Sequence, residues 1–331
     1  MKRASSVTLL LVATMAATSA NEACKSDDPA TGGNSPGMPG TSIPLTDGGS
    51  KVDSGKVNVV DAGQDSGSVD AGPPLCDPTI SWTSNGRLPA LDTTSLSELG
   101  AVSGTELTLA WTKANGDLYV ADRADTSSNF STANKVDTGT TALATGRVAL
   151  SPTGKAIIAV ASGGTSLVEL DRATTTSTTW TKASENVFAQ INAFLAEASG
   201  KVSEPVIGAD KLTLYLLATL GANPPFIYES RYAASVSQWA SPGSLLPTAL
   251  RSTNATNQRR RPTGASADRR TLFFYDEVGG LERAAWRTTP DTAFSQFVDL
   301  TGFSESVPNT ACDTLYFQAS DTGGAGVFTA Q

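Results

Sequence analysis

A short apolar segment recurs five times along the last three quarters of the chain. Each copy is apolar or alternating over five to seven residues and follows a turn-forming stretch, so each predicts a β-strand. The copies align on Thr108, Ile157, Thr213, Thr271 and Thr314, at steps of 43 to 58 residues. Self-similarity at about this period, with several short strands per copy, is typical of a β-propeller.

Two further elements follow most copies. A second apolar strand comes first, as in GDLYVADR and TSLVELDR, and an arginine then precedes a large aromatic residue by seven or eight positions. These pairs are Arg123 and Phe130, Arg172 and Trp180, Arg231 and Trp239, and Arg287 and Phe294. A single large apolar side chain per outer strand is more often core than ligand platform, so we expect each aromatic to pack between blades.

The chain has five apolar segments but only four of the arginine–aromatic pairs. A missing outer strand can come from the start of the domain, with Trp82 in place of the fifth aromatic. We therefore predict an all-β fold, a propeller of five four-stranded blades whose last blade is shared between residues 78–91 and 301–331. Closure by the two ends of the domain leaves no open sheet edge. Four or six blades are the alternatives, although the spacing leaves little room for a sixth.

Two of the three cysteines bear on this closure. Cys76 immediately precedes the proposed closing strand, and Cys312 lies in the last hairpin. A shared blade brings these distant positions together, so we expect a Cys76–Cys312 disulfide in an oxidising compartment. The alternative is a pair of buried free thiols.

The N-terminal quarter divides into two segments. Residues 1–23 are predicted to be a signal peptide, with Lys2 and Arg3 before a short apolar stretch. Cleavage could follow Ala20, or it could precede Cys24 and leave a lipidated cysteine, since NEAC resembles a lipobox in its Ala-Cys ending. Residues 24–75 are rich in Gly, Asp, Ser and Pro and predict a disordered linker. Residues 76–331 then form the propeller domain.

Composition excludes several functions. The chain has no histidine, which removes Ser-His-Asp catalysis and histidine-ligated zinc. Its net charge of −8 argues against a nucleic-acid partner, because neutralising phosphates needs a basic surface. Phosphate-loop and calcium-loop motifs are absent from the sequence, and we expect neither a cofactor nor a metal.

Three stretches suggest a family. RVALSPTGKAIIAVAS, EPVIGADKLTLYLL and RPTGASADRRTLFFY resemble the WD40-like Pro-Asp repeat of TolB-type propellers, whose unit ends in Ser-Pro-Asp-Gly before an apolar strand. Thr153 replaces the aspartate in the best copy. The resemblance extends over residues 78–331 and implies a propeller that binds proteins, peptides or glycans.

One charged residue per blade stands nine or ten positions before each aligned Thr or Ile. These residues are Glu98, Arg147, Glu204, Arg261 and Glu305, which alternate in sign and would ring one mouth of the central channel. We call them the charged ring. They could bind a ligand or simply form salt bridges between neighbouring blades. Glu98 and Glu305 are neighbours where the ring closes, and no arginine stands between them in the order of the blades. That pair is therefore predicted to have a raised pKa or to bind a cation.

Two functions follow. The first is a non-catalytic, monomeric binding or scaffolding propeller that meets an envelope protein or a polysaccharide at the charged ring. It would be extracytoplasmic, either secreted or held at the outer membrane or cell surface through a lipid on Cys24. The alternative is a five-bladed glycoside hydrolase similar to arabinanases, using Glu98, Glu204 or Glu305 as a carboxylate pair. We expect a binding protein rather than an enzyme, because the arginines would keep these carboxylates ionised.

Overall fold

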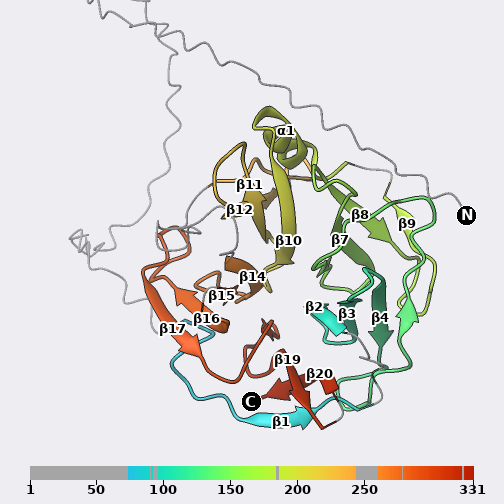
Figure 1. The fold of residues 1–331 in the computed structure, drawn as a ribbon, viewed down its shortest axis with the longest axis vertical. Helices are drawn as coiled ribbons and strands as arrows, with labels where there is room; N and C mark the ends of the chain where they lie inside the picture. Colours follow the sequence, from blue (N-terminus) through green and yellow to red (C-terminus); the bar gives the residue numbers. More distant parts are fainter. Residues whose placement is uncertain are drawn as a thin grey trace, which may run out of the picture. The chain divides into compact units, whose positions relative to one another are not determined.

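A computed structural model describes residues 74–89, 91, 96–183, 186–243, 260–277, 279–322 and 324–331. The predicted signal peptide, Cys24 and most of the linker lie outside these residues. The described residues form five four-stranded antiparallel sheets arranged around a common axis (Figure 1). The predicted fold, a five-bladed β-propeller, is confirmed.

The chain fills the blades in order, and each blade is counted here from the axis outward. The first strands are β2 (Leu96–Val102), β6 (Ala149–Leu150), β10 (Lys201–Ile207), β14 (Arg260–Ala265) and β18 (Val307–Pro308). The second strands are β3 (Thr108–Lys113), β7 (Ala156–Val160), β11 (Thr213–Thr219), β15 (Thr271–Asp276) and β19 (Leu315–Asp321). The third strands are β4 (Leu118–Asp122), β8 (Leu167–Asp171), β12 (Phe226–Ala233), β16 (Leu281–Trp286) and β20 (Gly324–Ala330). The outermost strands are β5 (Asn134–Lys135), β9 (Thr181–Lys182), β13 (Gln238–Trp239), β17 (Gln296–Leu300) and β1 (Ser84–Arg87).

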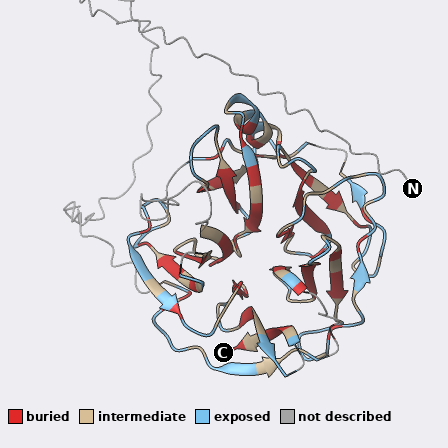
Figure 2. Cartoon of the chain, in the orientation of Figure 1, coloured by how far each residue is buried: buried red, intermediate tan, exposed pale blue. Residues whose placement is uncertain are grey.

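The recurring apolar segments are the second strands. Both faces of a blade pack against neighbouring blades, so a second strand is covered on both sides and its sequence is a nearly continuous apolar run. All five residues of β7 are buried, for example. Figure 2 shows the change from buried strands near the axis to exposed strands at the rim.

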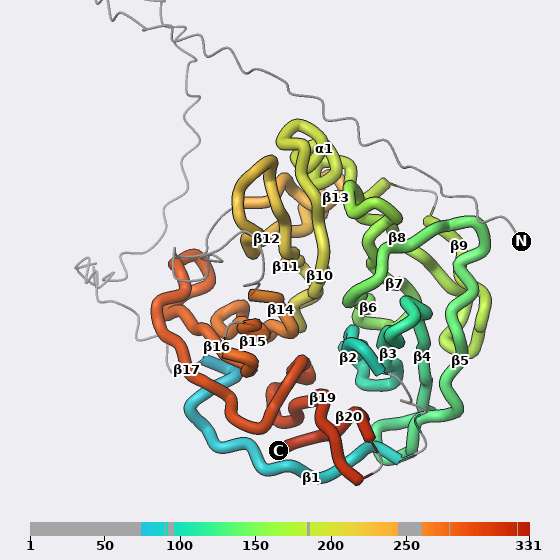
Figure 3. Tube along the Cα trace, in the orientation of Figure 1, coloured from blue at the N-terminus to red at the C-terminus, as the bar shows by residue number. Residues whose placement is uncertain are grey.

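The fifth blade closes the ring. β1 pairs with β20 in the order β18–β19–β20–β1, so the first strand of the domain completes the last sheet (Figure 3). The closing strand is Ser84–Arg87, within residues 78–91, the segment predicted to contribute to this blade. Trp82 is only partly buried, but it packs against the core between blades four and five, the place predicted for the fifth aromatic.

The hydrophobic core is divided among the five seams between blades. Each seam holds one cluster of buried side chains contributed by the two blades that meet there. The four predicted aromatics lie in four different clusters, each at the seam with the preceding blade, and all are at most 6% exposed. These aromatics are Phe130, Trp180, Trp239 and Phe294.

The arginine of each predicted pair ties its blade to a neighbour. Arg123, Arg172 and Arg287 stack on their aromatics, with the guanidinium carbon 4.4–4.8 Å from the ring centroid. Each also donates from Nε to a backbone carbonyl in the turn before the second strand of its own blade. Their terminal nitrogens reach the preceding blade, as Arg172 does at Asp122 (2.6 Å). Arg231 differs, because it reaches forward to Asp291 in blade four.

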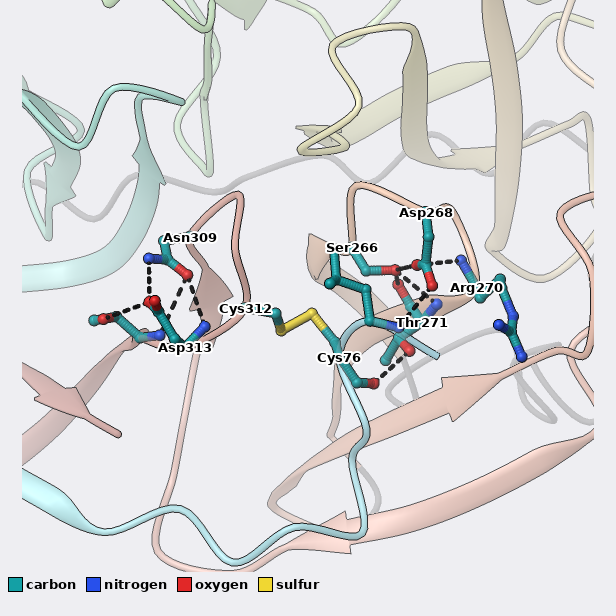
Figure 4. The surroundings of a disulfide bond; sticks show 10 residues. Cys76, Ser266, Asp268, Arg270, Thr271, Asn309, Cys312 and Asp313 are labelled. Carbon is teal, nitrogen blue, oxygen red and sulfur yellow. Dashed lines mark hydrogen bonds between the residues drawn. A yellow bond between two sulfur atoms is a disulfide. The ribbon is translucent and has the colours of Figure 1, made fainter. Parts of the chain in front are cut away.

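A disulfide lies at the seam between blades four and five (Figure 4). No arginine–aromatic pair closes blade five, and Cys312 occupies its turn before the second strand. Cys312 is bonded to Cys76, as predicted. The Cys76 carbonyl accepts a hydrogen bond from Thr271 in blade four, and the Leu75 N–H donates to Asp268 in the same blade. The segment before β1 thus links blade five to blade four, as the arginines link the other blades.

One helix was not anticipated from the sequence. α1 (Ala189–Glu197) precedes β10 and buries Ile191 and Leu195 against the core between blades two and three. In the described part of the chain, no helix has the length and apolar character needed to cross a membrane.

Replacing Cys76 and Cys312 by alanine should lower the free energy of unfolding by about 4–5 kcal/mol, because a cross-link over 236 positions strongly restricts the unfolded chain. Urea denaturation of the oxidised protein and of the double variant would measure the difference. Cys24→Ala, which removes a thiol before the described residues, is the control and should leave the midpoint unchanged. Equal stability of the double variant and the oxidised protein would contradict the structural role of the bond.

Candidate functional site

The five residues of the charged ring lie at one end of the axial channel. Glu98, Glu204 and Arg261 belong to first strands, while Arg147 and Glu305 come two positions before one. From this end each first strand runs along the channel to the turn that precedes the second strand. Toward the other end, residues of the first strands of all blades and of the turns that follow them line a small pocket of about 40 Å³, enough for a few water molecules.

Arg147 lies across the channel and contacts each of the other four blades. Its Nη1 donates to the carbonyls of Gly100 in blade one (2.9 Å) and Thr263 in blade four (3.2 Å). Its Nη2 pairs with Glu305 of blade five, and its Nε lies 4.0 Å from Glu204 of blade three. The side chain has no exposed surface. A buried guanidinium on one strand therefore joins all five blades.

Arg261 spans the channel nearer its mouth. Nη1 pairs with Glu98 (2.6 Å) and Nη2 with Glu305 (2.7 Å), while Nε lies 3.2 Å from Glu277. The prediction that Glu98 and Glu305 lack a cation between them was wrong, because this guanidinium bridges both. Long arginine side chains reach over the channel to blades that are not their neighbours, which the order of residues in the sequence does not indicate.

Glu282 is a further buried carboxylate beneath the ring. It accepts hydrogen bonds from the Thr263 hydroxyl and from the N–H groups of Glu305 (3.0 Å) and Ser306 (3.3 Å). Burial raises the pKa of Glu282 to about 7, against the opposing effect of these donors. Its contacts with the backbone hold Glu305 in place, so Glu282 positions a ring residue from the third strand of blade four.

Glu204 and Glu98 each place a carboxylate oxygen close to Gly146. A methyl group added at Gly146 would lie 3.6 Å from Glu204 Oε1 and 3.9 Å from Glu98 Oε2. Burial, and then the Glu98 carboxylate, raise the pKa of Glu204 to about 7, although Arg261 and Arg147 oppose the shift. Glu98 Oε2 and Glu204 Oε2 are buried and have no hydrogen-bond partner among the described residues. Glu204 Oε2 faces Arg147 Nε at 4.0 Å, while Glu204 Oε1 is the oxygen near Gly146.

Two ring glutamates have strained backbones. Glu204 and Glu305 adopt φ values of 52° and 55°, in the left-handed region that residues other than glycine rarely enter. Strain of this kind persists where the surrounding contacts over-determine it, and it clusters at functional sites. Here the ion pairs with Arg147 and Arg261, and the hydrogen bonds that the Glu305 and Ser306 N–H groups donate to Glu282, supply those contacts for Glu305.

Reasoning from the sequence identified the five ring residues but missed Glu277, Glu282 and Gly146. Glu282 is paired with the fifth residue of the second strand, counted from the aligned threonine. The same position holds the apolar residues Leu118 in blade one and Ile227 in blade three. An acidic residue in an otherwise apolar position was therefore a usable signal. Gly146 has a φ of 132°, and nothing in the spacing of the repeats marks it.

The mouth is charged and only partly open. Side-chain exposure is 17% for Glu98, 13% for Arg261 and 29% for Glu277, whereas Arg147, Glu204 and Glu305 are enclosed. Within the described ranges, no group of three or more histidine, cysteine or acidic residues is arranged as metal ligands. The arrangement suits recognition of a polar or charged group at the mouth, above a rigid network of ion pairs.

The sequence matches no protein-family model and no curated protein. Solved structures with similar folds include TolB from Acinetobacter baumannii, at 13% identity and a TM-score of 0.39 over 71% of this chain and 53% of that chain. The chain therefore spans about half of TolB. A nidogen/laminin complex matches at 12% identity and a TM-score of 0.39, over 74% of this chain and 87% of that one.

The catalytic domain of a Coprinopsis cinerea GH62 α-L-arabinofuranosidase is similar to 76% of this chain and 96% of its own, at 12% identity and a TM-score of 0.48. At these identities the similarity concerns the fold alone, and function has to be argued from the site.

Arg147→Met should lower the free energy of unfolding by about 3–5 kcal/mol, because Glu204 and Glu305 would remain buried without this partner. Chemical denaturation would measure the loss. Lys135→Met removes an exposed ion pair with Asp117 and should have no measurable effect. Similar stability of the two variants would show that Arg147 does not hold the blades together.

Stability should also depend on pH through Glu204. Since its pKa is about 7 in the folded protein and near 4.3 when unfolded, the folded state binds the extra proton between these values. Its contribution is therefore fully present below about pH 4 and is lost as pH rises to 7, by on the order of 3 kcal/mol. Glu204→Gln should flatten this decline of stability with pH. The decline that remains in the variant should come from Glu282.

Thermal unfolding between pH 4.5 and pH 8 would compare the two proteins. Asp299→Asn, which removes an exposed carboxylate on β17, is the matched control and should follow the unmodified chain. A Glu204→Gln profile parallel to the unmodified one would mean that Glu204 ionises normally in the folded state.

Proposed function

We propose that the chain is a non-catalytic binding or scaffolding propeller that recognises a protein or a polysaccharide of the cell envelope at the charged mouth of its channel. The observation that carries this proposal is the closure of that end by Arg147 and Arg261. Their ion pairs tie the ring carboxylates into a rigid network, which is well suited to presenting fixed charges but leaves little freedom for catalytic proton transfer. Glu98, Arg261 and Glu277 form its accessible outer layer.

The position of the N-terminal segment supports this assignment. Cys76 is bonded to Cys312, in the turn at the end of the channel opposite the charged ring. In our proposal residues 1–23 are an export signal, residues 24–75 are a linker, and the mature chain is secreted or anchored through a lipid on Cys24. A disulfide is compatible with such a compartment.

A glycoside hydrolase is the second candidate, and one observation favours it. Glu204 has a pKa of about 7, suitable for a general acid, and the Glu98 carboxylate approaches the same glycine, Gly146. Glycosidases use such a pair, with one carboxyl group protonated and the other ionised. Against this, the Glu204 side chain is only 6% exposed.

Incubation of the full chain with a panel of envelope proteins and bacterial and plant polysaccharides would separate the two functions. We expect retention of at least one partner without release of sugars, and weaker retention by the mouth variants Glu98→Gln and Glu277→Gln. Asp299→Asn, on the outer rim, is the control and should retain the partner. Sugar release that Glu204→Gln abolishes would establish the hydrolase instead, and absence of both retention and release would contradict both functions.

A further inference from the structure

A polar cleft lies at the seam between blades five and one, on the face that carries the turns before the second strands. Its volume is about 540 Å³, within the range of small-molecule sites, roughly 300–1,000 Å³. Hydroxyl and amide side chains line both walls, among them Thr126, Ser128 and Asn129 of blade one and Thr314, Thr329 and Gln331 of blade five. The charged ring lies at the opposite end of the channel, so the cleft is separate from the charged mouth.

At two other seams, the arginine that reaches the preceding blade is paired with a carboxylate there. Between blades one and two, both terminal nitrogens of Arg172 donate to Asp122, at 2.7 and 2.6 Å. Between blades three and four, the terminal nitrogens of Arg287 donate to Glu229 (3.1 Å) and to the Thr292 carbonyl (3.3 Å). These two guanidinium groups therefore have no terminal nitrogen left without a partner.

Arg123, at the seam that holds the cleft, has no carboxylate to receive it in blade five. The two corresponding positions of the third strand hold Gln331 and Thr329, which carry no side-chain carboxylate and both line the cleft. Arg123 Nη2 donates to the Tyr316 hydroxyl (3.0 Å), whereas Nη1 has no hydrogen-bond partner in the described part of the chain. The Arg123 side chain is only 7% exposed and also lines the cleft. A buried guanidinium with an unused donor thus borders this space.

A free acceptor comes from the turn that the disulfide anchors. Figure 4 shows Asn309 and Asp313 beside Cys312 in this turn. Asn309 donates to Glu106 Oε1 (2.9 Å) and to Asp313 Oδ1 (2.7 Å). The other Glu106 oxygen accepts from Tyr316 (2.6 Å), so both oxygens of that carboxylate are engaged. Asp313 Oδ2 has no such partner among the described residues, and Asp313 is exposed.

We propose that this cleft binds a neutral sugar residue, whose hydroxyl groups accept from Arg123 and donate to Asp313. This is a second site, and it goes beyond the function proposed for the charged mouth. A hydroxyl group both donates and accepts, so a sugar ring with adjacent hydroxyls can satisfy both free groups. The side chains of the walls supply further donors and acceptors, and Leu88 and Pro89 offer apolar surface to the ring carbons.

The charges around the cleft favour a neutral ligand over an anion. Glu106 Oε2 lies 3.8 Å from Arg123 Nη2, so the guanidinium already has a counter-charge. A ligand carboxylate at Nη1 would add a negative charge to a cleft that already contains Glu106 and Asp313, and like charges repel. A hydroxyl carries no charge and still gains hydrogen bonds to ionised groups, which are stronger than those between neutral groups.

NMR titration of the full chain with the methyl glycosides of glucose, galactose, mannose and N-acetylglucosamine would test the site. We expect at least one of them to bind, and to bind about tenfold more weakly to Asp313→Asn, because a hydrogen bond to a charged group is lost. Asparagine keeps the Oδ1 acceptor that Asn309 uses and replaces only the free oxygen. Arg123→Lys removes the free donor and should weaken binding as much. If that variant does not fold, Asp313→Asn, at an exposed side chain, still tests the proposal.

Two control variants match these changes. Thr178 lines the corresponding cleft between blades one and two, where Asp122 occupies the arginine, so Thr178→Ala should bind like the unmodified chain. Asn129→Ala removes a polar side chain from the wall of the proposed site and should weaken binding instead. Asp299→Asn, which removes an exposed carboxylate on β17, should have no effect.

Three results would overturn the inference. The first is that none of the four glycosides binds, and the second is that Asp313→Asn binds them as the unmodified chain does. The third is tighter binding of glucuronate than of methyl glucoside, which would make the cleft a site for anions.

Discussion

The buried guanidinium of Arg147 is the interaction on which the centre of this propeller depends. Five sheets around an axis each pack against two neighbours, and hydrophobic contacts at the seams cannot reach across the channel. Arg147 does so with a single side chain, because its planar group carries donors in several directions. Removing such a charge from water is costly, so it is stable there only with carboxylates and carbonyls on all sides. The surrounding glutamates, and the buried Glu282 that holds one of them, are the counterpart of that one cation.

At the seams, neighbouring blades are joined by a second and more regular set of arginine contacts. Three arginines stack on an aromatic of their own blade, bond the turn beside it and reach back to the blade before. The residue whose carbonyl accepts the Nε–H has a positive φ in each case: Glu106, Gly154 and Arg269. Cys312 has the same backbone conformation in blade five and carries the disulfide there. A covalent bond thus occupies the position where blades one, two and four use an arginine.

Much of this architecture could be predicted from periodicity. The aligned Thr and Ile residues located the second strands, and the count of arginine–aromatic pairs indicated the shared blade. Counting back nine or ten positions from each aligned residue placed five charged residues at one end of the channel. The pairing among those residues could not be predicted in the same way, because spacing along a strand gives the level of a side chain but not the direction in which a long arginine extends. Glu282 was missed because it comes from a third strand, and α1 because it interrupts the repeat between two strands.

The closure of blade five has a consequence for how the domain reaches this structure. β1 is the first strand of the domain to be synthesised, yet its partner β20 is the last. The loop that must close between them is nearly as long as the domain itself, and contacts so distant in sequence form slowly. Until they form, two adjacent strands have unpaired edges, which are the feature of β-proteins most prone to intermolecular association. The order of synthesis therefore makes the final pairing the step at which folding and aggregation compete, and the cysteines lie beside the strands that must meet.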